Sequence, residues 1–356
     1  KNQKKEKISR DFTEPVYSNM TEDHSINMAW HNVTNVAANN AVQQVLASTS
    51  GLTTIAPTWF SLADTEGNIS SIADADYVNY AHTAGLEVWA VFRDFHGGTN
   101  SYDETYETLR YTSKRAKLED QVVAAAVAAG VDGINLDFEL ISSKCGVHYV
   151  QLVRELSVKC HQNNLVFSVD NYVPQSYNSH YDLKEQGIVA DYVVIMAYDE
   201  HTEGSYEAGS VASISYLQDG IEKTLKKVSA DKVIAGIPFF TRLWFETAKS
   251  SEQLSEEAGT EAASYPNKVS SKALGMEEAA QSVVNAGATA QWDEKTQQNY
   301  AKWSADGGTY RIWLEDAQSL EAKLKVIQGN KLAGVAEWSL GREESSVWKL
   351  ISQYVN

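Results

Sequence analysis

The fold of this chain is decided by one stretch, Val131-Asp132-Gly133-Ile134-Asn135-Leu136-Asp137-Phe138-Glu139. It follows an Ala-rich helical segment that ends at Gly130, and its own pattern is that of a short strand. Alternate residues of a strand point to opposite faces, so Asn135, Asp137 and Glu139 share one face and the intervening apolar residues share the other. The stretch is therefore predicted to be a strand with one polar face and one apolar face.

The polar face of this strand is predicted to line the inside of a barrel. Helices have to cover the apolar face of a barrel strand, which leaves Asn135, Asp137 and Glu139 toward the interior. Such groups are costly in a packed interior unless they are paired, protonated or used in chemistry. Catalytic groups of (β/α)8 barrels lie at the carboxyl ends of the strands, and Glu139 is the last of the series. We therefore expect Glu139 to be the acid of an active site.

Short apolar, β-branched runs recur along the chain with helical stretches between them, which is the pattern of repeated βα units. Eight runs are predicted as strands: Ile26–Trp30, Thr54–Phe60, Glu87–Phe92, Gly133–Phe138, Leu165–Val169, Tyr192–Met196, Val233–Ile237 and Gly334–Trp338. Helices are predicted over Asp76–Ala84, Glu104–Ala129, Val147–Gln162, Ser213–Val228 and Ser319–Gln328. Eight βα units in 356 residues indicate an α/β protein built on a closed (β/α)8 TIM barrel. The alternative is an open doubly wound sheet, but the sequence has no glycine-rich phosphate loop to support it.

The seventh and eighth predicted strands lie about 100 residues apart, whereas most strand intervals are about 30–45 residues. We therefore expect a small α+β insertion between strands 7 and 8, at about residues 245–312. Within it, Ala288–Trp292 and Tyr310–Trp313 alternate like antiparallel strands. The predicted organisation is a polar N-terminal tail or linker over residues 1–24, followed by a barrel over residues 25–356 that contains the insertion lobe.

The chain is rich in aromatic rings, with 9 Trp, 18 Tyr and 9 Phe. Such rings suit sugar binding, although a large core also uses them. Insertions at the carboxyl ends of barrel strands carry function, so we expect the lobe to form one wall of the cleft. Its candidate residues are Trp292, Tyr300, Trp303 and Trp313, of which at least half are expected to pack in the lobe's own core.

The charge and the residue composition of the chain exclude several classes of partner and ligand. Lys and Arg number 30 against 47 Asp and Glu, a net charge of −17, so phosphate backbones and anionic membrane surfaces would be repelled. We expect no nucleic-acid partner, and no membrane span because no apolar run reaches about 18 residues. A helix between Cys145 and Cys160 would hold them about 22 Å apart, too far for a disulfide. The His and carboxylate spacings match no metal site, and neither a metal nor a cofactor is expected.

The segment Asp132–Glu139 resembles the D-G-x-D-x-D-x-E motif of glycoside hydrolase family 18, the chitinases and related N-acetylglucosaminidases. Three other segments agree with this resemblance. Ile195–Asp199 resembles the M-x-Y-D of the family's sixth strand, and Ala235–Arg242 resembles the G-x-P-x-Y-G-R of its seventh. Gly334–Gly341 resembles the region of its eighth-strand Trp. The matches extend from about the first strand to Leu350.

Two further segments, Asp170–Pro174 and Trp313–Asp316, are similar to the branch of the family found in spore-cortex and cell-wall lytic enzymes of Gram-positive bacteria. The chain departs from the family at two positions, with Asn135 where Asp is usual and Phe138 where Trp is common. The lytic branch tolerates both changes, so the resemblance still implies an active enzyme. It also implies that the central carboxylate has lost its proton-sharing partner.

The resemblance implies a retaining, substrate-assisted glycosidase, in which the 2-acetamido oxygen of the substrate is the nucleophile. Glu139 would protonate the leaving oxygen and later activate water, with a pKa raised by burial beside Asp137. Asp137 would hold the acetamido N–H and stabilise the oxazolinium intermediate, and Asn135 would orient Asp137. Tyr198 would donate its hydroxyl hydrogen to the acetamido oxygen. The candidate substrate-binding residues are Trp338, the floor of a sugar subsite, and Asp199, Arg242 and Asn171.

The function predicted from this resemblance is that of an endo-β-N-acetylglucosaminidase acting on peptidoglycan or related glycans, with chitin or chito-oligosaccharides as the alternative substrate. A second alternative is a catalytically silent sugar-binding member of the family. Such members typically lose the final acid, which this chain keeps as Glu139. We expect a secreted or cell-envelope monomer, in the wall or spore of a Gram-positive bacterium, that binds a polysaccharide or oligosaccharide containing N-acetylglucosamine.

Overall fold

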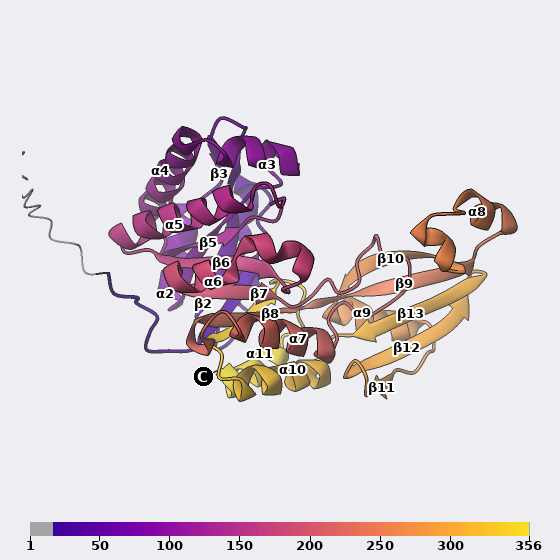
Figure 1. The fold of residues 1–356 in the computed structure, drawn as a ribbon. Helices are drawn as coiled ribbons and strands as arrows, with labels where there is room; N and C mark the ends of the chain where they lie inside the picture. The colour runs from indigo at the N-terminus through magenta and orange to yellow at the C-terminus, as the bar shows by residue number, and fades with distance from the viewer. Residues whose placement is uncertain (1–16, 356) are drawn as a thin grey trace, which may run out of the picture.

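The computed structural model describes residues 17–355, and its larger part is a ring of parallel strands (Figure 1). These strands pair in the order β1-β14-β8-β7-β6-β5-β4-β2, and β1 also pairs with β2, which closes the ring. Their bounds are β1 Ile26–His31, β2 Thr54–Leu62, β4 Glu87–Arg93, β5 Gly133–Asp137, β6 Val166–Tyr172, β7 Tyr192–Met196, β8 Val233–Pro238 and β14 Gly334–Trp338. Each overlaps one of the eight predicted runs, so the predicted TIM barrel is confirmed. The short strand β3 (Ile69–Ser71) adds to β2 in the antiparallel direction.

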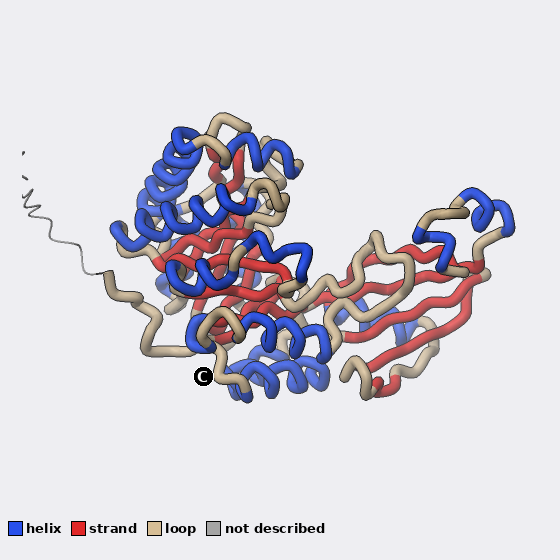
Figure 2. The backbone as a smooth tube through the Cα atoms, viewed as in Figure 1, coloured by secondary structure: helices blue, strands red, loops and turns tan. Residues whose placement is uncertain are grey.

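Helices cover the outside of the barrel, as the blue and red tubes of Figure 2 show. The α-helices are α1 Val42–Leu46, α2 Ala75–Thr83, α3 Tyr102–Leu109, α4 Thr112–Ala129, α5 Gly146–Gln162, α6 Leu183–Val189, α7 Ile214–Leu225, α8 Ser251–Glu256, α9 Met276–Asn285, α10 Ala317–Gly329 and α11 Val347–Val355. Short 3-10 helices are η1 Val36–Ala41, η2 Ser176–Tyr181, η3 Ala230–Lys232 and η4 Glu261–Ser264. The apolar core between helices and strands includes Ile134, Leu136 and Phe138. The apolar face of β5 therefore points outward, as the alternation predicts.

The predicted helix Glu104–Ala129 is in fact two helices. α3 ends at Leu109 and α4 begins at Thr112, with Tyr111 in an extended conformation between them (φ −102°, ψ 122°). The buried Arg115 donates from Nη1 to the carbonyl oxygen of Leu109 (2.7 Å), so this helix-end carbonyl has a partner. Neither Gly nor Pro marks the break, and the apolar periodicity runs on through it.

A second, antiparallel sheet lies beside the barrel (Figure 1). Its strand order is β10-β9-β13-β12-β11, with bounds β9 Phe240–Ala248, β10 Asn267–Gly275, β11 Gln291–Asp293, β12 Gln298–Ala305 and β13 Gly308–Leu314. Helix α9 packs on this sheet through a small apolar core that includes Ala279, Val283 and Ile312. The lobe thus has a core of its own, separate from that of the barrel.

Only part of this second sheet follows from the sequence. β13 contains the predicted strand Tyr310–Trp313, but Ala288–Trp292 is only partly a strand, since β11 begins at Gln291. The strands β9, β10 and β12 were not predicted. In β10, exposed and half-buried residues alternate with few apolar side chains, so the period-two signal of this strand is weak.

A buried ion pair connects the lobe to the helices of the barrel. Glu315, directly after β13, and Lys323 of α10 are 2% and 1% exposed. Lys323 Nζ donates to both carboxylate oxygens of Glu315 (2.9 and 3.0 Å), and Gln298 of β12 and Ser319 of α10 donate to the same carboxylate. A buried pair with this many hydrogen bonds is costly to break, so it fixes where the lobe meets α10.

The described part of the predicted N-terminal tail lies against the barrel, while residues 1–16 of that tail are outside the described residues. The Tyr17 hydroxyl donates to Asp191 (2.9 Å), and its ring stacks on His161 with 4.0 Å between centroids. The hydroxyls of Thr21 and Tyr192 are 2.6 Å apart. The chain from Tyr17 onward is therefore docked on the end of the barrel where the strands begin.

Cys145 and Cys160 are both free and buried, at the two ends of α5. Among residues 17–355, no helix combines the length and the apolar character that crossing a membrane requires.

Candidate active site

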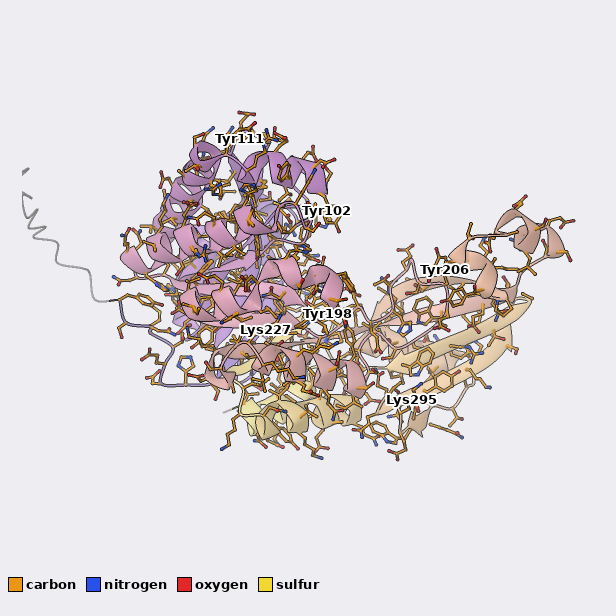
Figure 3. The ribbon with its side chains drawn as sticks, viewed as in Figure 1. Tyr102, Tyr111, Tyr198, Tyr206, Lys227 and Lys295 are labelled. Atoms are coloured by element: carbon orange, nitrogen blue, oxygen red, sulfur yellow. The ribbon has the colours of Figure 1, made fainter. Side chains whose placement is uncertain are left out.

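A cavity opens at the carboxyl ends of the barrel strands. Figure 3 labels Tyr198, one of its lining residues, where the barrel meets the second sheet. Of the predicted site residues, Asp137, Glu139, Tyr198, Asp199 and Trp338 line this cavity. They lie at or just beyond the ends of β5, β7 and β14. Three strands that are distant in sequence thus bring their polar ends to one place.

Asn135 lies fully buried beneath the cavity. Its amide nitrogen donates to Ser168 Oγ (2.9 Å) and Asp170 Oδ1 (2.7 Å), and its oxygen accepts from Trp30 Nε1 (3.0 Å). Asp137 is not among these hydrogen-bond partners, and the role of Asn135 in orienting Asp137 stays a prediction. Asn135 holds Asp170, and Asp137 Oδ1 is buried without a hydrogen-bond partner among the described residues.

Asp137, Glu139 and Asp170 form a cluster of carboxyl groups with raised pKa values. Burial raises the pKa of Asp137 well above its ordinary value, and the charges of Glu139 and Asp170 raise it further. Burial also raises the pKa of Asp170 to about 8, although the hydrogen bond from Asn135 opposes this shift. Such a cluster holds at least one proton at neutral pH. Asp170 is thus a further buried carboxyl group whose charge acts on Asp137, although Asp137 Oδ1 and Asp170 Oδ2 have no hydrogen-bond partner among the described residues.

Glu139, just after β5, is held at its backbone and at its side chain. Its backbone N–H donates to Asp94 Oδ1 (2.8 Å), and the N–H of Leu140 donates to Asp94 Oδ2 (2.9 Å). The Tyr172 hydroxyl donates to Glu139 Oε2. Burial raises the pKa of Glu139, the Tyr172 hydrogen bond lowers it, and the charge of Asp199 raises it. A positioned carboxyl group with a raised pKa is suited to proton donation near neutral pH.

Tyr198 and Trp338 bring aromatic rings to the cavity. Tyr198 meets Trp30 edge to face, with 6.5 Å between centroids, and Trp338 lies 6.0 Å from Trp30. Burial raises the pKa of Tyr198 well above its ordinary value, so its hydroxyl stays protonated and can donate a hydrogen bond. This group of rings gives the cavity an apolar side opposite the carboxyl groups of β5 and β6.

Asp199 follows Tyr198 with a left-handed backbone (φ 58°). Burial raises the pKa of Asp199, and the positive charge of Arg242 lowers it. Arg242 lies on β9, where its Nη1 donates to Ser271 Oγ (3.0 Å), and it does not line the cavity. Its substrate contact stays a prediction.

Asn171 does not line this cavity, and its predicted contact with substrate stays a prediction. Its side chain exchanges two hydrogen bonds with Gln186 (2.7 and 2.9 Å) and donates to the carbonyl oxygen of Val169 (3.2 Å). Asn171 follows Asp170 in β6, and alternation turns neighbouring residues of a strand to opposite faces. Asp170 faces the barrel interior, so Asn171 faces the surrounding helices.

Eight residues that line the cavity were not predicted as site residues from the sequence: Trp30, Asn32, Arg93, Phe95, His96, Asp170, Tyr172 and Met196. Alternation along β6 could have identified Tyr172, since it lies two residues beyond Asp170 on the same face. Arg93, Phe95 and His96 lie at the end of β4 and in the loop after it, where no periodic signal exists. Only the tertiary fold brings these three residues to the cavity.

Three of the four aromatic residues expected to form a wall of the cleft lie against other aromatic rings of the lobe. Tyr300 lies 4.8 Å from Trp313 between centroids, and Trp303 stacks on Tyr310 at 5.4 Å. In the described part of the chain, barrel residues line the cavity and none of the lobe's four candidate aromatic residues does. The four aromatic residues do not line this cavity, and the prediction that the lobe forms one wall of a longer substrate cleft is left untested by this observation.

A (β/α)8 barrel with a buried acid beside a second carboxyl group, facing aromatic rings at its carboxyl end, defines a sugar-cleaving hydrolase. Residues 29–343 match the model of the glycosyl hydrolases family 18. The chain belongs to this family and is a chitinase-like glycosidase.

Individual relatives agree with the family. The chain is 26% identical over 295 residues to YvbX of Bacillus subtilis, named an uncharacterized glycosylase, with 80% of each chain covered. It is 27% identical over 256 residues to the cortical fragment-lytic enzyme of Bacillus subtilis, covering 69% of this chain and 54% of that enzyme. This chain thus spans about half the length of the lytic enzyme. The crystal structure of the Bacillus cereus spore cortex-lytic enzyme SleL has the same fold, with a TM-score of 0.78 at 19% identity over 93% of this chain and 74% of that one.

Proposed function

We propose that this chain is a retaining, substrate-assisted endo-β-N-acetylglucosaminidase that acts on glycans of the bacterial wall or spore. The observation that carries the proposal is the pair Asp137 and Glu139. Both come from the end of one strand, both have raised pKa values, and both line the cavity that holds Tyr198. A pair on one strand suits one acid and one stabilising carboxyl group, with the acetamide of the substrate as nucleophile.

In the first step of this mechanism, the acetamido oxygen attacks the anomeric carbon while Glu139 gives its proton to the leaving oxygen. Tyr198 donates a hydrogen bond to the acetamido oxygen and holds it near the carbon that it attacks. Asp137 accepts the acetamido N–H and stabilises the positive oxazolinium ring; its unpartnered Oδ1 supports this role. In the second step, the Glu139 carboxylate takes a proton from water, which attacks the same carbon and restores its configuration.

Trp338 is proposed as the floor of the sugar subsite, because the apolar face of a pyranose stacks well on indole. Its ring lies beside Trp30, so the two together offer a broad apolar surface. Asp199 lines the cavity and would accept hydrogen bonds from sugar hydroxyls.

The proposed substrate is peptidoglycan, on the basis of the similarity to the cortical fragment-lytic enzyme and of the segments Asp170–Pro174 and Trp313–Asp316. Glu315 of the second segment forms the buried pair that anchors the lobe. The proposed location is outside the membrane, as a secreted or envelope protein of a Gram-positive bacterium, and the proposed state is a monomer. A silent sugar-binding function is disfavoured, because Glu139 is present and lines the cavity.

Hydrolysis by the wild-type chain and by Glu139→Gln tests this proposal. The substrates are a chromogenic chito-oligosaccharide and purified cell walls, the latter followed by analysis of the released fragments. We expect wild-type cleavage after N-acetylglucosamine and a loss of about 10²–10⁴-fold in Glu139→Gln, because the substitution removes the proton donor. Glu139→Gln should keep the wild-type melting temperature and should still bind oligosaccharide. Activity within a few-fold of wild type in a folded Glu139→Gln would overturn the assignment.

A further inference from the structure

Arg93 is a basic residue in a cavity whose described lining also contains four acidic residues. It is the last residue of β4, and its Cα is the register partner of Asp137 on β5. Partners in a parallel ladder point their side chains to the same face, and both residues line the cavity. Arg93 is thus next to the proposed catalytic pair.

The Arg93 guanidinium is not paired within the described part of the chain. Its Nε is buried without a hydrogen-bond partner, and Arg93 makes no ion pair within 4.0 Å among residues 17–355. By contrast, Arg115, Arg154 and Arg311 each bond a carboxylate at 2.6–3.0 Å. The guanidinium of Arg93 lies 5.5 Å from the centroid of the Phe95 ring, a cation–π contact that holds it in place. Its fork of donors is therefore held in the cavity and left free.

The charges of the residues that line the cavity indicate which kind of ligand the N–H groups of the Arg93 guanidinium can bind. Asp137, Glu139, Asp170 and Asp199 line the cavity, and Arg93 is the one Lys or Arg among its described lining residues. An anionic group of a substrate would be repelled by these acids without a nearby cation. A guanidinium binds a carboxylate through two parallel hydrogen bonds, a geometry that neutral sugar hydroxyls do not match. The free guanidinium of Arg93 therefore matches a carboxylate on the substrate better than it matches an uncharged chain of N-acetylglucosamine.

We propose that Arg93 is a specificity residue that binds a carboxylate carried by the substrate glycan, on a sugar close to the scissile bond. The substrate class is then an acidic N-acetylated glycan, of which the lactyl-bearing muramic acid units of peptidoglycan are an example. This inference rests on the proposed function, because it concerns the same cavity. It separates peptidoglycan from chitin, which carries no carboxylate.

The test compares two substrates within each protein variant. One is a peptidoglycan glycan strand freed of its peptides, which carries only lactyl carboxylates, and the other is the same strand with these carboxylates reduced to alcohols. A chito-oligosaccharide serves as the neutral reference. The proteins are the wild type, Arg93→Gln, Arg93→Lys and the control Arg110→Gln, which removes an exposed arginine at the end of α3. The measured quantity is the ratio of kcat/KM on native strands to kcat/KM on reduced strands, because the two substrates differ only in the carboxylate. An effect of Arg93 on Asp137 changes kcat/KM on both substrates equally and therefore leaves this ratio unchanged.

We expect this ratio to be about 10–100 in the wild type and in Arg110→Gln, the range of a charge-assisted hydrogen-bonded pair. It should fall to about 1 in Arg93→Gln and take an intermediate value in Arg93→Lys, which keeps the charge but not the fork. Equal rates of the wild type on native and reduced strands would overturn this inference and leave the proposed function standing. An unchanged ratio in Arg93→Gln would also overturn it. A wild type that cleaves none of the three substrates would overturn the proposed function itself. The wild-type ratio alone can contradict the inference, so the inference stays testable even if a variant fails to fold.

Discussion

The carboxylate of Asp94 accepts a hydrogen bond from the backbone N–H of Glu139 at 2.8 Å. Its other oxygen accepts from the N–H of Leu140 (2.9 Å) and from Thr105 Oγ1 of α3 (3.1 Å). Asp94 comes directly after β4, so one buried side chain joins the end of β4, helix α3 and the segment after β5. The position of the proposed acid is therefore set from a neighbouring strand as well as from its own.

Asp94→Asn should lower kcat by about 10–100-fold with a smaller change in KM, because a displacement of about 1 Å in a catalytic group has an effect of this size. The amide of Asn can accept at only one end, so one of the two backbone N–H groups loses its partner. Steady-state kinetics and thermal melting of the same samples check this. Thr105→Val is the matched control, since it removes the third hydrogen bond but leaves the Glu139 and Leu140 bonds intact. A fall in melting temperature with wild-type kcat would show that Asp94 stabilises the fold without positioning Glu139.

Asn135→Asp should move the alkaline limb of the kcat/KM profile to higher pH. The Asn135 amide lowers the pKa of Asp170, and a carboxylate in its place removes that donor and adds a like charge. The cluster of Asp137, Glu139 and Asp170 would then hold its protons to higher pH. Apparent pKa values of the profile are the quantities to compare, because the groups titrate together. Ser168→Ala removes another partner of Asn135 without adding charge and should leave the limb in place. An unmoved limb in Asn135→Asp would show that this network does not reach the acid.

The barrel and the centre of the site could be predicted, because the alternation of apolar and polar residues along a strand indicates both the strand itself and the face that points into the barrel. In β5, the apolar residues Ile134 and Leu136 identify the face that meets the helices, and this in turn points Asn135 and Asp137 inward. The same rule holds for β6, whose inward face was not identified from the sequence. Phe167 and Val169 are both apolar and pack outward, so alternation places Asp170 and Tyr172 inward and Asn171 outward.

The rest of the site could not be read from the sequence, because it depends on residues that tertiary structure brings together. Asp94 and Glu139 are 45 positions apart and meet through a backbone hydrogen bond, which leaves no motif. Arg93 has the same pattern in sequence as any charged residue at the end of a strand. At the break of the predicted helix Glu104–Ala129, the side chain of Arg115 likewise reaches back to the carbonyl oxygen of Leu109, a contact that the sequence pattern does not show.

Glu337→Met should stabilise the protein at neutral pH. Glu337, on β14, is fully buried, and neither of its carboxylate oxygens has a hydrogen-bond partner among the described residues. Burial raises its pKa well above the ordinary value of 4.5, and the charge of Glu343 adds to the shift. A carboxyl group whose pKa is raised by folding binds its proton more tightly in the folded state, so stability falls as pH rises from about 4.5 toward the raised value.

Replacement by an apolar side chain of similar length removes this penalty. We expect the free energy of unfolding of Glu337→Met to exceed that of the wild type by about 1–3 kcal/mol at pH 7.5, and by less at pH 4.5. Denaturant unfolding at the two pH values measures this. Glu294→Met, in the exposed turn after β11, is the control and should show no such pH dependence. A gain that is equal at both pH values would mean that the charge of Glu337 is not the cause.

Cleavage should require a 2-acetamido group on the sugar that precedes the scissile bond. In the proposed mechanism the nucleophile comes from the substrate, and Asp137 and Tyr198 act only by holding and polarising that acetamide. A glucosamine at this position would present an ammonium group, which cannot attack and which would pair with Asp137 instead. Matched N-acetylated and N-deacetylated oligosaccharides test this, with analysis of the bonds broken and of the anomer first released. We expect a loss of cleavage after glucosamine and a retained anomer after N-acetylglucosamine. Efficient cleavage after glucosamine would mean that a protein carboxylate is the nucleophile, and Asp199, which lines the same cavity, would be the first to examine. An inverted first product would instead mean that water attacks directly, because a single displacement reverses the configuration that two displacements restore.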